Sequence, residues 1–200
     1  MNTISLNRTW KFRLDPENVG LSEAWHSNTQ TLETGSIDID VPSCWEELEQ
    51  DYEGVAWYST QVEIDADKAG QICRIVFQAS NYRTGIWINA KAAGSHDGGY
   101  TPFDFEIQDF LNYGASNQIT VRIVSPIITK DIRVDDLGPN DMPHWRGGLT
   151  AGIWQSATLE FNQSAWIKHT FYKPKIKDSA FELDLELRCN EATSQAAILK

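Results

Sequence analysis

Hydrophobic and polar residues alternate along much of this chain, so its structural period is two and not the 3.6 of an α-helix. The segment 181–189 has an apolar residue at every odd position and a charged residue at each position between. Segments 37–41 and 119–123 repeat this alternation. A period of two places one face of a β-strand on a core and the other in water. The pattern therefore predicts half-buried strands.

Further strands are predicted where β-branched and aromatic residues gather between turn signals. These segments are 57–64, 72–78, 85–89, 103–107 and 153–161. Gly- and Asn-containing turns separate them, for example at 67–70 and 112–114. The only helical expectation is one short turn within 43–49. Many short strands divided by turns predict an all-β sandwich or barrel.

The charge balance excludes some classes of partner. The 200 residues include 17 Lys and Arg against 28 Asp and Glu, a net charge of −11. Nucleic acid is not an expected partner, because phosphate binding needs clustered basic residues. No membrane partner is expected either, since no apolar run approaches the ~20 residues of a membrane-spanning helix.

The first ten residues show no basic patch followed by an apolar stretch, so no secretory signal is visible in them. We therefore expect a cytoplasmic location. A periplasmic or secreted protein is the alternative, if a signal peptide was removed upstream of this numbering.

The usual sequence signatures of catalysis are missing from these 200 residues. There is no nucleophile elbow, zinc-binding helix motif, dinucleotide-binding motif or phosphate-binding lysine loop. The four histidines have no metal-ligand spacing, and the three cysteines form no C-x-x-C pair. We expect no catalytic residue, no cofactor and no metal here. Eight tryptophans are present, and most are predicted to fill the core, although such rings also stack on sugars.

A composition shift near residues 162–164 predicts a domain boundary. The chain is acidic before it, whereas four lysines lie between positions 166 and 177. We expect one domain over 1–162 and a second over 163–200. About 38 residues cannot close a sandwich by themselves, since unpaired strands are unstable. The second unit is therefore expected to be the truncated start of something longer.

Five motifs occur in an order that resembles the N-terminal sugar-binding domain of glycoside hydrolase family 2. They are Val41–Trp45, Trp57–Tyr58, Phe77–Asn89, Gly94–Ile107 and Gly152–Trp154. The resemblance implies a jelly-roll β-sandwich of the galactose-binding-domain type, followed by the start of an immunoglobulin-like β-sandwich. One departure is visible: the family usually closes the hairpin after the Phe77–Asn89 strand with Asn-Gly, whereas Ala90 follows Asn89 here. The departure changes the expected turn, which we predict to be a longer loop with Asn89 left-handed.

The resemblance also implies a function in carbohydrate metabolism. The parent protein would hydrolyse β-glycosides with retention, using two glutamates on a TIM barrel that lies beyond this chain. The partners implied are that barrel, the immunoglobulin-like domain and, through the parent enzyme, a carbohydrate substrate; a homo-oligomer stays open. The 200 residues alone are expected to be inactive. The alternatives are a freestanding carbohydrate-binding jelly-roll module and a structural sandwich without a ligand.

Two loops are candidates for the rim of the parent enzyme's substrate pocket. The first supplies Asp51, Tyr52 and Glu53, and the second supplies His144, Trp145 and Arg146. Family members carry a substrate-contacting Asp six residues before the Gly of the Gly-Ile-aromatic motif, and Arg146 stands there instead. Its guanidinium could bind a carboxylate or sugar hydroxyls, with Trp145 as a stacking face. The alternative is an Arg paired with the acidic surface beside a buried Trp.

Overall fold

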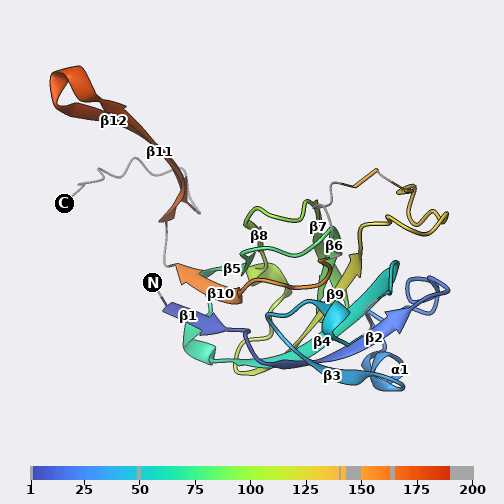
Figure 1. Ribbon diagram of the computed structural model, residues 1–200. Helices are drawn as coiled ribbons and strands as arrows, with labels where there is room; N and C mark the ends of the chain where they lie inside the picture. Colours follow the sequence, from blue (N-terminus) through green and yellow to red (C-terminus); the bar gives the residue numbers. More distant parts are fainter. Residues whose placement is uncertain (1, 49–50, 140, 143–149, 163–164, 190–200) are drawn as a thin grey trace.

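The computed structural model describes residues 2–48, 51–139, 141–142, 150–162 and 165–189. Two antiparallel sheets pack face to face as a β-sandwich, and a two-stranded hairpin projects from it (Figure 1). The chain is thus all-β, as the alternation predicts. No helix in the described ranges has the length and apolar character that a bilayer crossing needs.

The larger sheet has six strands. In spatial order they are β3 (Ile37–Asp40), β2 (Thr9–Asp15), β4 (Val55–Ile64), β9 (Ala115–Val124), β6 (Arg83–Ile88) and β7 (Lys91–Asp97). Strands β4 and β9 form its centre and pair over their full length, from Val55 opposite Val124 to Ile64 opposite Ala115.

The smaller sheet has four strands and closes the core from the other side. Its order is β1 (Asn2–Ser5), β10 (Ala157–Asn162), β5 (Ile72–Phe77) and β8 (Phe103–Glu106). Buried side chains from both sheets form one continuous core, which includes Tyr58 and Val121 of the large sheet and Phe77 of the small one. The rings of Phe12 and Tyr58 meet edge to face within it, with centroids 4.9 Å apart. Burial of these large apolar surfaces is the main force that holds the two sheets together.

The hairpin consists of β11 (Ala165–Lys175) and β12 (Ala180–Cys189). The helices are short: α1 (Thr29–Glu33) and the single 3₁₀ turns η1 (Trp45–Glu47), η2 (Ala66–Lys68), η3 (Gln108–Phe110) and η4 (Ile176–Asp178). The turn η1 lies inside the predicted segment 43–49.

Three sequence expectations differ from the structure. The strand predicted over 153–161 begins only at Ala157. Before it, the carbonyls of Gly152 and Ile153 accept hydrogen bonds from the backbone N–H groups of Asn81 and Ser43, which lie in loops and not in a strand. The hairpin after β6 is closed by two residues and not by a longer loop, with φ of 49° at Asn89 and 69° at Ala90. The outer face of the large sheet is covered by other parts of the chain. Thr120 and Arg122 are therefore buried, although the alternation predicts that their side chains face solvent.

Candidate functional site

Several loops leave the sandwich at one end of the large sheet, which we call the rim end. Val55 and Val124 are paired there, so residues 51–54 enter β4 beside the exit of β9 into 125–142. Arg83 pairs with Val124 and with Asp97, which adds the connections around 78–82 and 98–102 to the same end. The opposite end carries the turns at 65–70, 89–90 and 110–114. The first predicted rim loop and the segment leading into the second are therefore neighbours.

Glu53 joins these two neighbours. Its side chain is only 2% exposed, and its carboxylate accepts hydrogen bonds from the backbone N–H groups of Ile128, Thr129 and Lys130 at 3.0–3.1 Å. The Thr129 hydroxyl donates a further bond of 2.8 Å. Burial by itself raises the pKa of the Glu53 carboxyl, but these donors outweigh it and hold that pKa below its ordinary value. Glu53 is thus an ionised clamp between the two loops.

Tyr52 is also engaged inside the protein. Its hydroxyl donates a 2.6 Å hydrogen bond to the carbonyl of Val55, and its ring packs edge to face on Trp45 with centroids 6.0 Å apart. Burial raises the pKa of the Tyr52 hydroxyl to about 12, so it is a hydrogen-bond donor at neutral pH. Asp51, by contrast, is exposed. Of the first rim triplet, only Asp51 offers its side chain to solvent.

The second rim triplet, His144, Trp145 and Arg146, lies outside the described residues. The residues that flank it are described on both sides. Met142 is 2% exposed and belongs to an apolar cluster on the outer face of the large sheet, and Ala151 is fully buried in the main core. The described residues Met142 and Ala151, on either side of the triplet, are thus both buried in the fold.

Gly152, just after that return, has a backbone that only glycine adopts readily. Its φ is +104°, and a Cβ atom there would lie 2.5 Å from the Tyr58 hydroxyl oxygen. Its N–H and carbonyl bond to the backbone of Asn81. The glycine of the Gly-Ile-aromatic motif therefore has a structural role, because it lets this segment approach the central strand β4.

A ladder of aromatic rings covers the outer face of the large sheet. Trp57 lies in the middle, with ring centroids 6.0 Å from Trp25 and 5.4 Å from Trp87. His26 stacks on Trp87, and the Arg13 guanidinium lies 3.7 Å from the ring centroid of Trp25. The Trp57 indole N–H donates to the buried carboxylate of Asp15. Trp25 and Trp57 belong to a second core and Trp87 packs against it, in line with the prediction that most of the tryptophans fill the core.

Charged residues hold Asp135, in the segment that follows β9, against this outer face. Arg122, 5% exposed, donates to the Asp135 carboxylate at 2.5 Å and to the Asn18 side chain at 2.7 Å. Arg83 forms a two-point ion pair with Asp97 and also donates to the Asp135 carbonyl. The Arg83 side chain holds the pKa of the Asp97 carboxyl below its ordinary value. Nothing in the sequence marks the partners of Arg122, since they lie 13 and 104 positions away from it.

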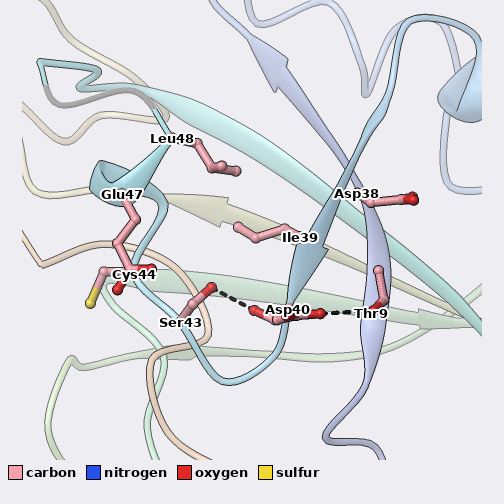
Figure 2. A pocket seen from close by; sticks show the side chains of 8 residues that line it. All are labelled: Thr9, Asp38, Ile39, Asp40, Ser43, Cys44, Glu47 and Leu48. Carbon is pink, nitrogen blue, oxygen red and sulfur yellow. Dashed lines mark hydrogen bonds between the residues drawn. The ribbon is translucent and has the colours of Figure 1, made fainter.

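A shallow hollow of about 290 Å³ lies beside the edge strand β3 (Figure 2). Figure 2 shows the hydroxyls of Thr9 and Ser43 turned toward Asp40; they donate to its carboxylate and to its carbonyl oxygen respectively. The lining of the hollow contains three carboxylates and no aromatic ring. Burial, and then the charges of Glu46 and Glu47, raise the pKa of the Cys44 thiol, so Cys44 is no thiolate nucleophile. The hollow has neither a stacking surface nor an activated nucleophile.

The described part of the chain contains no group of three His, Cys, Asp or Glu side chains placed to hold a metal ion. The arrangement at the rim end is suited to display short loops from a rigid frame.

Comparisons with known proteins agree with this architecture. The model of the family described as glycosyl hydrolases family 2, sugar binding domain, matches residues 48–160, more than half of the chain. A β-galactosidase of Thermoanaerobacter pseudethanolicus is 26% identical over 181 residues, which cover 90% of this chain and 22% of the relative. A β-glucuronidase of Bacteroides fragilis is 31% identical over 125 residues, 60% of this chain and 16% of the relative.

Solved structures show the same fold. The crystal structure of Ruminococcus gnavus β-glucuronidase superposes with a TM-score of 0.75 at 20% identity, over 93% of this chain and 33% of that one. The chain spans about a fifth of the length of the curated relatives. With the family match over residues 48–160, the ordered motifs and the sandwich fold, this chain belongs to glycosyl hydrolase family 2 and contains the sugar-binding domain of that family.

Proposed function

We propose that this chain is the non-catalytic N-terminal part of an enzyme that hydrolyses β-galactosides or β-glucuronides. The observation that carries the proposal is the family match, together with relatives named β-galactosidase and β-glucuronidase of which the chain spans about a fifth. In this proposal residues 1–162 form the sugar-binding domain and 163–200 begin an immunoglobulin-like domain. The catalytic carboxylates would lie on a TIM barrel elsewhere in the protein.

The work of the sugar-binding domain in this proposal is to present rim loops to the substrate pocket. Support comes from the rim end, where the Glu53 clamp fixes the loop that carries the exposed Asp51. A carboxylate such as Asp51 can accept hydrogen bonds from sugar hydroxyls, and a guanidinium such as Arg146 can donate them. Preorganised groups of this kind add binding energy without a further ordering cost.

The test uses the full-length protein that contains this chain. Asp51→Ala and Arg146→Ala are expected to lower kcat/KM for an aryl β-glycoside by an amount equivalent to ~1–3 kcal/mol each, without lowering the melting temperature. Asp109→Ala is the matched control, because Asp109 is an exposed aspartate on η3, at the opposite end of the sandwich. Unchanged kinetics in both rim variants would refute the substrate contact. Absence of glycoside hydrolysis by the wild-type protein would refute the parent activity.

A further inference from the structure

A groove of about 380 Å³ lies between the small sheet and the hairpin, on strand β8, and Asp51, Tyr52 and Glu53 are not among the residues that line it. Asp104, Phe105 and Glu106 of β8 line one side, with Phe105 packed against the main core, and Trp166, Lys168 and Arg188 of the hairpin line the other. Its volume falls in the range of ordinary small-molecule sites, roughly 300–1,000 Å³. From these side chains and their arrangement we propose that the groove is an accessory subsite for a neutral pyranose sugar.

A buried arginine holds two of the lining residues in place. Arg74 is 8% exposed and points outward from β5. Its guanidinium bonds to Glu160 at 2.5 Å, lies 3.3 Å from the Asp104 carboxylate, and sits 5.1 Å from the ring centroid of Trp166. The acceptor on one wall and the ring on the other are thus positioned by the same charged group. A site positioned in this way loses little side-chain entropy when a ligand binds.

The two cations of the groove share a single partner. The Oε1 atom of Glu186 lies 3.3 Å from Lys168 Nζ and 3.2 Å from an Arg188 guanidinium nitrogen. Lysine and arginine each keep further N–H groups beyond the one this contact uses. Donors on the hairpin therefore face acceptors on β8, and the described residues contain no ion pair that joins Lys168 or Arg188 to Asp104 or Glu106 across the groove.

The composition of the walls selects the class of ligand. A pyranose ring has apolar C–H faces that pack on an aromatic ring, and hydroxyls that both donate and accept hydrogen bonds. Trp166 supplies the ring, the two carboxylates accept, and the two cations donate. The four charged lining groups sum to zero, which favours a neutral sugar over a uronate.

The test titrates the 200-residue chain with methyl β-D-galactopyranoside, methyl β-D-glucopyranoside and glucuronate, followed by saturation-transfer NMR and tryptophan fluorescence. We expect saturable binding of at least one neutral glycoside with a Kd on the order of 1 mM, and weaker binding of glucuronate. Trp166→Ala should weaken the neutral sugar at least tenfold, whereas Trp166→Phe should retain part of the affinity. The pair Lys168→Ala and Arg188→Ala, both exposed side chains, should weaken it without disturbing the fold.

Matched controls lie on the same hairpin outside the groove. Phe181→Ala removes an exposed aromatic ring and Lys175→Ala another exposed lysine, and both should bind like the wild type. Absence of saturable sugar binding by the folded wild-type chain, or binding that is insensitive to both groove variants, would overturn the subsite. Tighter binding of glucuronate than of the neutral glycosides would overturn its assignment to a neutral sugar.

The subsite and the proposed function can fail separately. In the full-length protein, Trp166→Ala should leave kcat/KM for a small aryl β-glycoside unchanged, because the described residues that line the groove include none of the rim candidates. A large loss of that activity would place Trp166 in the catalytic machinery and overturn the accessory role. Absence of hydrolysis by the wild-type protein would leave the sugar titration of the chain unaffected.

Discussion

Strands β9 and β12 have the same length of ten residues and both contain alternating apolar side chains, yet they end in opposite environments. The last six residues of β9 are all buried, whereas no residue of β12 is. Strand β9 lies between β4 and β6, with the small sheet on one face and the aromatic ladder on the other. Strand β12 has only β11 beside it. Alternation therefore predicts a strand, but its burial depends on what packs against each face.

The charged residues of the two regions differ in the same way. Arg122 of β9 is buried and depends on Asp135 and Asn18 for compensation. Arg188 of β12 is exposed and contacts Glu186 in solvent. Loss of a buried, paired group leaves its partners without compensation, whereas loss of an exposed one is made up by water. The free energy of unfolding should thus fall when a buried side chain of the sandwich is removed, and should hardly change when an exposed side chain of the hairpin is removed.

The largest difference is expected from removing one aromatic ring in each region. Trp57→Ala removes a fully buried ring that packs between Trp25 and Trp87, and should lower the free energy of unfolding by ~3–5 kcal/mol. Phe181→Ala removes a ring that is 59% exposed and should change it by less than ~0.5 kcal/mol. Urea denaturation followed by circular dichroism measures both. Similar losses in the two variants would contradict the comparison.

A smaller effect is expected from the Glu53 clamp. Glu53→Gln keeps the shape of the side chain but replaces charge-assisted hydrogen bonds by neutral ones, and should cost about 2 kcal/mol at pH 7. The lowered pKa of Glu53 means that its stabilisation is present at neutral pH and is lost as the pH falls through that pKa. The difference between the wild type and Glu53→Gln should therefore narrow toward acid pH, as seen in melting temperatures measured from pH 7 downward.

Glu63→Gln is the control for this prediction. Glu63 is an exposed glutamate on β4, so its substitution should change the free energy of unfolding by less than ~0.5 kcal/mol. A Glu53→Gln deficit that stays constant as the pH falls would show that the charge of Glu53 is not what stabilises the loops.

The tight turn at Asn89–Ala90 should yield a gain in stability. Ala90 has a left-handed φ of 69°, which strains an alanine but not a glycine. Ala90→Gly is expected to raise the free energy of unfolding by ~0.5–1 kcal/mol. Ala92→Gly, two residues further along in strand β7, should lower it instead, because a glycine in a strand only adds flexibility to the unfolded chain. Thermal melts of the two variants should shift in opposite directions, and a parallel shift would contradict the assignment of strain.

The smallest effect is expected from the ion pairs of the hairpin. Lys173 lies 2.5 Å from Asp184 and 3.7 Å from Glu182, and all three side chains are about half exposed. Lys173→Ala should change the free energy of unfolding by less than ~0.5 kcal/mol, because water and ions screen such pairs. At high salt the change should be smaller still. A loss above about 1 kcal/mol would show that the hairpin depends on charge as the sandwich depends on its core.

The local patterns predicted much of the fold. Alternation predicted three of the strands, β-branched and aromatic residues between turns predicted five more, and the predicted turn within 43–49 contains η1. Strand β7 has no alternating apolar side chains, so nothing in its composition could predict it; it forms because β6 provides a partner. The start of the predicted strand 153–161 was wrong because Gly152 pairs with a loop at Asn81.

The candidate site was predictable only as a set of loops. Asp51, Tyr52 and Glu53 were selected by their place before the Trp-Tyr strand, but the sequence could not separate the exposed Asp51 from the buried Tyr52 and Glu53. That distinction depends on segment 125–142, whose backbone N–H groups lie more than 70 positions away from Glu53. The roles of His144, Trp145 and Arg146 stay a prediction.

By itself the sequence determined the strand period, the turns, the ordered motifs and so the family, because each of these depends on residues close together in the chain. The tertiary structure decided which faces are buried, which carboxylate is a clamp and which charges meet around Arg74. Those outcomes depend on contacts between residues far apart in the chain. Such residues are removed from water and paired with one another only once the sheets have packed.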